Sequence, residues 1–350
     1  MTTITVHASR EYNVDVGKGL LAGLGSKARS LCPRAGTVML VTDSRVDALY
    51  GRTAEENLAA AGFRVERFTF PAGEASKNTR TYLELIDRMA LAHMTRTDLC
   101  VALGGGVTGD LTGFAAATYL RGIPFLQVPT TVLAMVDASV GGKTAVDLEA
   151  GKNLLGAFWQ PVGVLCDTSL LSTLPEEIFV DGCAEILKYA LIGDPELYED
   201  LRAPFRDDPE RIIARCVQDK RDVVEEDERD TGRRQLLNYG HTFGHAIEKC
   251  SDYAVSHGSA VAIGMCMAAR AAAAFGLCPG DVPEKTAERV RALGLPDRTA
   301  YSARELALAA MSDKKRAGDR ISLVIPDRMC HVGLHPVPAE ELEDLFTKGL

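Results

Sequence analysis

Three histidines lie close together in the second half of the chain, where their spacing could hold a metal ion. His241 and His245 are four residues apart and therefore share one face of a predicted helix, and His257 follows shortly after. The other four of the seven histidines are scattered. No Glu directly follows His241, so this is not the His-Glu-x-x-His motif of metalloproteases.

A carboxylate and an amine precede this cluster. Glu185 and Lys188 are three residues apart, on one face of a predicted helix. One interpretation is a surface ion pair, which contributes little to stability. Their apolar neighbours favour a second interpretation, in which both side chains point into a site. Neutral imidazoles and one carboxylate suit zinc with one coordination position left open, and spacing alone does not choose among the histidines.

A glycine-rich segment in the first half is typical of a phosphate-binding turn. The apolar run 99–103 predicts a buried strand, three glycines follow at 104–106, and the alanine-rich segment after Gly109 predicts a helix. Such a helix start presents free amide groups and a favourable dipole to an anion. The spacing only approximates the dinucleotide fingerprint and lacks the Lys-Ser/Thr of a P-loop, so a plain tight turn is the alternative.

Further charged and polar side chains follow among glycines. They include Arg121, Asp137, Lys143 and the pair Lys152-Asn153, which we expect in loops. Open α/β sheets bind their ligands in loops at the carboxyl ends of strands. The segment therefore predicts a site for an anionic small molecule.

The order of predicted elements indicates two domains. Strands predicted at 4–16, 36–43 and 63–70 and a helix at 79–92 alternate as in a parallel sheet, which predicts an α/β domain over 1–175. Pro175, followed by two acids, is typical of a helix start. Beyond it the pattern is mainly helical over 176–350, with one strand-like run at 320–325.

Composition excludes several classes of protein. The net charge of −9 over 350 residues argues against a general nucleic-acid-binding protein. We find no stretch apolar enough for a membrane span, and the first ten residues do not resemble a secretory signal. The nine cysteines form no Cys-x-x-Cys pair, which favours a reducing cytoplasm over a disulfide framework.

Taken together, these motifs resemble the 3-dehydroquinate synthase family of sugar-phosphate cyclases. The resemblance extends over nearly the whole chain, and its order and completeness make it specific. The matching segments are 73–77, 104–110, 136–144, 151–153, 184–189, 227–228, 237–248, 257–258 and 313–315.

The resemblance implies an α/β N-terminal nucleotide-binding domain with a parallel-rich sheet, a mainly α-helical C-terminal domain, and a homodimer. It implies NAD and a divalent metal, Zn²⁺ or Co²⁺, and a phosphorylated sugar acid as substrate. The implied reaction converts 3-deoxy-D-arabino-heptulosonate 7-phosphate to 3-dehydroquinate and phosphate, in the shikimate pathway to the aromatic amino acids. It proceeds by transient oxidation, phosphate elimination, re-reduction and intramolecular aldol cyclisation, so NAD is regenerated.

Residue roles also follow from the resemblance. The implied metal ligands are Glu185, His241 and His257, which makes His245 an acid/base residue. The implied cofactor contacts are Asp43, Glu74, Lys77, Gly105, Gly106, Val107, Asp110, Thr130, Thr131, Lys143, Lys152 and Thr173. The implied catalytic set is Asp137, Lys143, Lys188, Lys220, Asn238 and His245. The implied substrate-binding set is Arg121, Lys152, Asn153, Arg234, Lys314 and Lys315, of which one of the last two makes the contact.

Two departures from the common family pattern bear on substrate choice. Residues 147–150 read Asp-Leu-Glu-Ala where many members have Asn-His-Pro, and Ser259 stands where Glu commonly follows the glycine. The alternatives are another cyclase, such as an aminodehydroquinate or 2-deoxy-scyllo-inosose synthase, and a metal-dependent alcohol or glycerol dehydrogenase.

Overall fold

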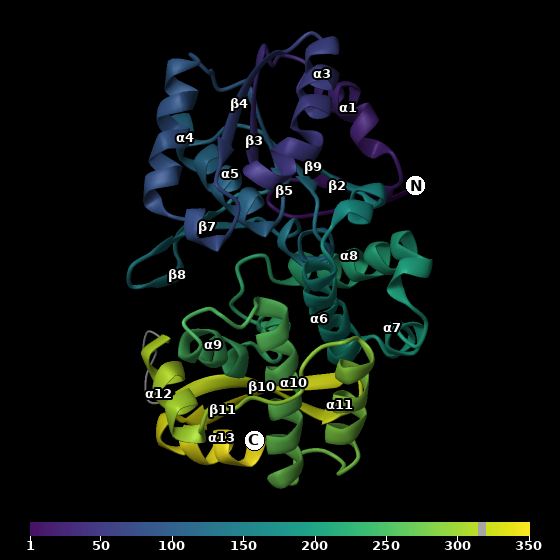
Figure 1. The fold of residues 1–350 in the computed structure, drawn as a ribbon, viewed down its shortest axis with the longest axis vertical. Coiled ribbons are helices and arrows are strands. Elements are labelled where there is room, and N and C mark those ends of the chain that lie inside the picture. Colours follow the sequence, from purple (N-terminus) through teal and green to yellow (C-terminus); the bar gives the residue numbers. More distant parts are fainter. Residues whose placement is uncertain (314–319) are drawn as a thin grey trace. The chain divides into compact units, whose positions relative to one another are not determined.

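A mostly parallel sheet forms the centre of the first part of the chain (Figure 1). The computed structural model describes residues 1–313 and 320–350, and within these ranges the sheet has seven strands in the order β1-β2-β9-β6-β5-β3-β4. Only β1 and β2 are antiparallel neighbours. The strands are β1 (Thr2–Val6), β2 (Tyr12–Gly17), β3 (Thr37–Asp43), β4 (Arg64–Phe70), β5 (Leu99–Gly104), β6 (Phe125–Pro129) and β9 (Gly163–Asp167).

Helices cover both faces of this sheet, as Figure 1 shows. Alternate residues of β3 point to opposite faces, so Val38 and Leu40 enter one hydrophobic core, whereas Met39 and Val41 enter the other. The first core includes α1 (Leu24–Leu31) and α3 (Arg52–Ala60), and the second includes α4 (Thr79–Leu91) and α5 (Gly106–Thr118). The predicted α/β fold class of this part of the chain is thus confirmed, as is the strand at 99–103.

A hairpin extends beyond this sheet. Strands β7 (Lys143–Leu148) and β8 (Gly151–Phe158) pair antiparallel with each other. Lys143, Lys152 and Asn153 therefore lie on strands, while Arg121 and Asp137 lie in the short helices η4 (Tyr119–Arg121) and η5 (Ala134–Ala138). The expectation that these five residues lie in loops is wrong. The alternation of small, apolar and charged residues here is too irregular to indicate strands from sequence.

The chain divides into two compact units. The first comprises residues 1–174 and 208–229, and the second comprises 175–207 and 230–350. The second segment of the first unit consists mainly of α8 (Pro209–Glu226), which packs against β1, β2 and the short helix η5 (Ala134–Ala138). The boundary predicted from the sequence, at residue 175, would instead place α8 in the second domain.

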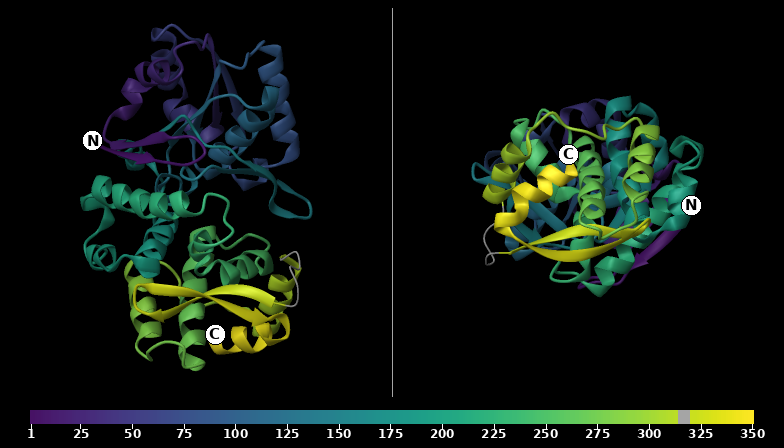
Figure 2. Two further views of the ribbon diagram at one scale, coloured as in Figure 1. Left: turned by 180° about the vertical axis from the view of Figure 1, so that it is seen from behind. Right: turned by 90° about the horizontal axis from the view of Figure 1, so that it is seen from below.

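The second unit is built around α10 (His257–Ala274), a helix that is buried around nearly its whole circumference. It packs against α6 (Glu176–Gly193), α9 (His241–Cys250), α11 (Val282–Ala292) and α13 (Leu342–Gly349). The hairpin of β10 (Arg320–Arg328) and β11 (His331–Pro338) lies beside it, in yellow in Figure 2. The strand predicted at 320–325 is confirmed, whereas β11 was not predicted. In the part of the chain that the structure describes, the remaining α-helices are α2 (Ser44–Val46), α7 (Pro195–Asp200) and α12 (Ala303–Asp313).

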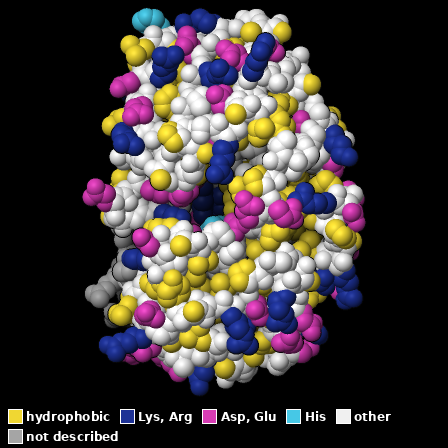
Figure 3. All heavy atoms as spheres, viewed as in Figure 1, with side chains coloured by type: hydrophobic (Ala, Val, Ile, Leu, Met, Phe, Trp, Pro, Cys, Tyr) yellow, Lys and Arg dark blue, Asp and Glu magenta, His cyan; other side chains and the backbone are white. Residues whose placement is uncertain are grey.

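The surface carries charges of both signs. On the face shown in Figure 3, Lys and Arg side chains are interspersed with Asp and Glu over each unit. Among the described residues, none of the helices has the length and hydropathy needed to span a bilayer. The nine cysteines all lie within the described residues and form no disulfide with one another, and six of them are buried.

Candidate metal centre and cofactor-binding residues

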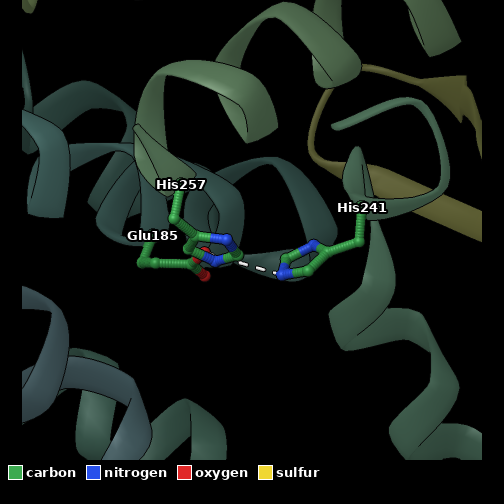
Figure 4. A group of neighbouring side chains, drawn as sticks. All are labelled: Glu185, His241 and His257. Atoms are coloured by element: carbon green, nitrogen blue, oxygen red, sulfur yellow. Dashed lines mark ion pairs between the residues drawn. The ribbon is translucent and has the colours of Figure 1, made fainter. Parts of the chain in front are cut away.

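Glu185, His241 and His257 converge inside the second unit (Figure 4). One potential ligand atom from each lies within 4.8 Å of the others. The Nε2 atoms of His241 and His257 are 3.6 and 3.3 Å from Oε1 of Glu185. Glu185 is completely buried on α6, while the histidines are the first residues of α9 and α10.

Glycines allow the helices to bring these ligands together. Gly240, which precedes α9, has a φ of +78° that favours glycine. A Cβ at Gly264 of α10 would lie 2.0 Å from the carbonyl oxygen of Gly240, and one at Gly244 would lie 3.0 Å from that of Ala260. The backbones of α9 and α10 are therefore in contact, which sets the separation of His241 and His257.

Each histidine has an oxygen facing its second ring nitrogen. Nδ1 of His241 lies 3.1 Å from the carbonyl oxygen of Tyr239, which can only accept, so Nδ1 carries the proton. Nδ1 of His257 lies 3.5 Å from Oε2 of Glu248. This leaves Nε2 of both rings facing Glu185, as in metal sites where a second oxygen orients the ligating imidazole.

Burial and neighbouring carboxylates determine the protonation of the two rings. Burial lowers the pKa of His241 to about 3, so its imidazole is neutral at physiological pH and suits a metal. Burial also opposes the charge on His257, but hydrogen bonds to Glu185 and Glu248 outweigh it and raise its pKa to about 10. A divalent cation at this position would compete with the proton of His257. Lys188 forms an ion pair with Glu185 and is 1% exposed.

The donor set fits a catalytic zinc-type ion. Two imidazole nitrogens and one carboxylate oxygen are borderline ligands that zinc accepts, and three protein ligands leave a position for substrate. A second group, of His245, Glu248 and His257, also has potential ligand atoms within 4.8 Å of one another. It shares His257 with the first group, and His245 is exposed. Geometry alone therefore leaves His245 as a competing ligand.

The predicted cofactor residues of the first unit lie beyond the carboxyl ends of parallel strands. Asp43 ends β3, Gly105 follows β5, and Thr130 follows β6. After β3 the chain adds β4 on one side and β5 on the other, so the strand order reverses between β3 and β5. Nucleotides bind at such a reversal in open α/β sheets.

The glycine-rich turn brings β5, α5 and β6 into close contact. A Cβ at Gly104 would lie 2.3 Å from Oγ1 of Thr108, and one at Gly109 would lie 2.6 Å from Oε1 of Gln127. Gly105 precedes the first residue of α5 and provides no side-chain cap. The first-turn amides of α5 therefore have no protein side chain at the N-cap, which suits a phosphate group.

Lys77 connects several predicted cofactor residues. Its ammonium group lies 2.6 Å from Oδ2 of Asp110 and donates a 2.6 Å hydrogen bond to Oδ1 of Asn153. Burial opposes the charge, but Asp110 and Glu74 outweigh it and raise the pKa of Lys77. Lys152 lies 3.8 Å from Glu74. These contacts bring together residues from η3 (Glu74–Ser76), α5 and β8.

Asp147, the first of the two departures from the family pattern, takes part in the same cluster. Its carboxylate accepts a 2.8 Å hydrogen bond from the amide of Asn153, and its own amide donates to the carbonyl of Lys77. Asn153 has a φ of +56°, in the left-handed region that asparagine tolerates better than most residues. Asp147 thus stabilises the bend that presents Lys152 and Asn153.

Two further contacts involve predicted residues of the first unit. Lys220 of α8 forms an ion pair with Asp137 and donates a 2.6 Å hydrogen bond to the carbonyl of that residue. The hydroxyl of Thr173 lies 2.6 Å from that of Tyr50. Arg121 is exposed, with a φ of +66°.

The predicted residues divide cleanly between the two units. The second unit holds the metal set and four other members, namely Lys188, Arg234, Asn238 and His245. Arg234 is only 1% exposed. The other described members, including all predicted cofactor contacts, belong to the first unit. Lys314 and Lys315 lie outside the described residues.

Sequence reasoning gave no role to two residues that contact the metal set or its helices. Glu248 lies seven residues after His241, and helical periodicity places them on one face of α9. Asp181 lies four residues before Glu185 on α6 and contacts the start of α10. Both spacings are visible in the sequence, but many carboxylates share such spacings by chance.

Comparison with solved structures identifies the class of fold. A 2-deoxy-scyllo-inosose synthase in complex with carbaglucose-6-phosphate, NAD⁺ and Co²⁺ is 27% identical, with a TM-score of 0.88 over 100% of both chains. A 2-epi-5-epi-valiolone synthase from Streptomyces hygroscopicus subsp. jinggangensis 5008, with NAD⁺ and Zn²⁺ bound, is also 27% identical. Its TM-score is 0.86, over 99% of this chain and 98% of the other. The fold is thus that of cyclases related to the predicted family.

Sequence comparison identifies the family. Models of the 3-dehydroquinate synthase N-terminal and C-terminal regions match residues 67–181 and 182–316. A 3-dehydroquinate synthase from Caulobacter vibrioides (strain NA1000 / CB15N) is 44% identical over 331 residues, which cover 90% of both chains. The chain belongs to the 3-dehydroquinate synthase family, as the sequence motifs predict.

Proposed function

We propose that this chain is a 3-dehydroquinate synthase. It converts 3-deoxy-D-arabino-heptulosonate 7-phosphate to 3-dehydroquinate and phosphate, as a carbon–oxygen lyase acting on phosphate in aromatic amino-acid biosynthesis. The observation that carries this proposal is the match of both family regions to a chain whose Glu185, His241 and His257 converge.

The proposed cofactors are NAD and one divalent metal ion, Zn²⁺ or Co²⁺. Their support is the donor set of the second unit and the strand-order reversal of the first. When bound, NAD supplies a reversible hydride acceptor and the metal supplies a Lewis acid for a substrate hydroxyl and carbonyl. The overall reaction involves no net change in the oxidation state of NAD.

Residues of the second unit provide the metal ligands and acid/base groups. Glu185, His241 and His257 would hold the metal, with Glu185 completely buried and the two histidines partly exposed. Exposed His245 exchanges protons with the substrate, for which a solvent-accessible ring suits better than a ligating one. Lys188 and Arg234 bring cationic donors for the acidic groups of the substrate, and Asn238 contributes an amide.

Residues of the first unit bind the cofactor and further anionic groups of the substrate. The amides of α5 and the side chains beyond β3 and β6 bind NAD, with Lys77 held in place by Asp110 and Asn153. The ion pair with Asp137 orients Lys220. Arg121, Lys143 and Lys152 supply positive charge that an acidic protein needs for a substrate carrying both carboxylate and phosphate.

Absorbance of NADH distinguishes this function from the main alternative of another class. The protein is incubated with the heptulosonate phosphate, zinc and excess NAD⁺ through many turnovers. A cyclase consumes the substrate without accumulation of NADH, whereas an alcohol or glycerol dehydrogenase accumulates one NADH per substrate. Steady accumulation refutes the proposal.

The other cyclases differ in substrate. Glucose 6-phosphate offers a phosphate but no carboxylate, and it therefore leaves part of the proposed cation set without a partner. We expect turnover of the heptulosonate phosphate, with 3-dehydroquinate identified by mass spectrometry, and no turnover of glucose 6-phosphate. The reverse preference would assign the chain to another cyclase of the same fold.

We propose that the enzyme is a homodimer and that it is located in the cytoplasm. Nine cysteines that form no disulfide with one another suit a reducing compartment. Leu154 and Leu155 of β8 are 45% and 37% exposed on an edge strand, a surface that a second copy of the chain would cover. Sedimentation velocity over a dilution series tests the dimer, and a single monomeric species at all concentrations would contradict it.

A further inference from the structure

We propose that Asp181 is a positioning residue for the metal centre, because it links the helix that carries Glu185 to the helix that begins with His257. The inference goes beyond the proposed reaction but rests on the proposed ligand set. It concerns Asp181 itself, to which the family resemblance assigns no role.

The two oxygens of Asp181 bind the first turn of α10. Oδ2 accepts a 3.0 Å hydrogen bond from the amide of Gly258, and Oδ1 accepts a 2.9 Å hydrogen bond from the amide of Ser259. The hydroxyl of Ser256, the N-cap residue, also donates to Oδ1. One carboxylate from α6 thus satisfies two of the free amides at the start of another helix.

The helix backbones are in contact at the same point. A Cβ at Gly258 would lie 1.9 Å from the carbonyl oxygen of Asp181 and 2.6 Å from its carbonyl carbon. Any larger residue at this position would separate α10 from α6. The contact and the hydrogen bonds therefore constrain both the distance between the helices and their rotation.

The metal ligands lie directly beside this link. On α6, Asp181 and Glu185 are four residues apart and share one face. On α10, His257 immediately precedes the two amides that Asp181 binds. A shift at Asp181 would therefore change the 3.3 Å separation of His257 Nε2 and Glu185 Oε1, and with it the preformed ligand geometry.

A second effect of Asp181 must be separated from this one. A carboxylate near a helix start also stabilises the helix through its dipole, whichever element supplies it. Ser259 is at the third position of α10, where a capping box would place Glu after an N-cap serine. A Glu at 259 therefore restores the cap of α10 from within the helix, without any link to α6.

The experiment compares metal affinity with stability in four variants. The dissociation constant for Zn²⁺ is measured by competition with a chromophoric chelator, and the melting temperature is measured on chelator-treated protein. The absorption spectrum of Co²⁺-loaded protein reports ligand geometry. The variants are Asp181→Asn, Asp181→Ala, Asp181→Ala with Ser259→Glu, and the control Glu177→Gln, which removes an exposed charge one turn earlier on α6.

We expect the zinc dissociation constant to rise about 10- to 100-fold in Asp181→Ala, as for other residues that orient metal ligands. Asp181→Asn retains one acceptor oxygen, so its zinc dissociation constant is expected to lie between those of Asp181→Ala and the parent. The double variant recovers the melting temperature but keeps the weak zinc affinity and the altered Co²⁺ spectrum. Glu177→Gln matches the parent in all three measurements.

Two results would overturn the inference. One is zinc affinity within twofold of the parent in Asp181→Ala, and the other is full recovery of affinity in the double variant, which would reduce Asp181 to a helix cap. If Asp181→Ala does not fold, the double variant decides between these outcomes. Failure of the parent itself to bind zinc would instead refute the proposed metal centre.

Discussion

At the scale of single residues, the two candidate metal-binding histidines differ in how they are oriented. A backbone carbonyl faces Nδ1 of His241, and it can only accept a hydrogen bond. A carboxylate, that of Glu248, faces Nδ1 of His257 and also favours a protonated ring. His241 is therefore prepared as a neutral ligand, whereas His257 must exchange its proton for the metal.

Substitution of His241 and His245 tests which histidine binds the metal. His241→Ala removes one of the three proposed ligands, so the purified protein is expected to lose its metal, as measured by atomic absorption. His245→Ala is expected to keep the metal and lose turnover by about 100-fold or more, as for other acid/base residues. Equal loss of metal in both variants would show that His245 is a ligand.

At the scale of elements, glycines set how closely α9 and α10 approach. Gly264→Ala forces a Cβ against the carbonyl of Gly240 and is expected to lower the free energy of unfolding by about 1–3 kcal/mol. The same helix shift should weaken zinc binding. Gly193→Ala, at the end of α6 with no atom within 4 Å of the new Cβ, serves as the control and should change stability by less than about 0.5 kcal/mol. Thermal melts that rank the two variants equally would contradict this account.

At the amino ends of the strands in the first unit, Asp98 has a role in stability. Asp98 precedes β5 and accepts hydrogen bonds of 2.9 and 2.8 Å from the amides of Gly36 and Thr37, at the start of β3. It also accepts hydrogen bonds from the amide and hydroxyl of Thr95. This carboxylate therefore joins the amino ends of two neighbouring strands, whereas the predicted cofactor residues lie at their carboxyl ends.

The Asp98 contacts make stability depend on pH. Burial alone would raise the pKa of Asp98, but its four hydrogen bonds outweigh burial and lower the pKa below 3.8. The carboxylate therefore contributes full stability above about pH 4, and this contribution is lost as the pH falls through the folded-state pKa. Asp98→Asn is expected to destabilise the first unit by about 1–3 kcal/mol at pH 7.

The fluorescence of Trp159, which lies in the first unit, follows its unfolding by urea. The difference between the parent and Asp98→Asn should shrink as the pH falls below about 4, because the carboxyl of the unfolded parent then takes up a proton, while the folded parent keeps its charge until the pH reaches its lower pKa. A difference that stays constant down to pH 3 would contradict the assigned role of the charge.

At the scale of the whole molecule, much of the fold could be predicted from local patterns. The alternation in 63–70 and the apolar run in 99–103 identified strands, and the acidic turn after Pro175 identified the start of α6. Strands β7, β8, β9 and β11 were not predicted, and in β7, β8 and β11 glycines, prolines and charges interrupt the pattern. The return of α8 to the first unit depends on contacts between residues far apart in sequence, which no local pattern encodes.

The candidate site, too, could be predicted only in part from local patterns. Helical spacing was sufficient to place Glu185 and Lys188 on one face, and both are buried on α6. The meeting of Glu185 with His241 and His257 depends on the packing of three helices, and only the family resemblance selected this set beforehand. The roles assigned to individual residues by that resemblance remain predictions.

The most direct test of the central claim is phosphate release from 3-deoxy-D-arabino-heptulosonate 7-phosphate. With NAD⁺ and Zn²⁺ we expect one phosphate per substrate consumed. Treatment with a chelator should abolish release, and either Zn²⁺ or Co²⁺ should restore it. Absence of phosphate release with both cofactors present, or release that a chelator does not affect, would contradict the account.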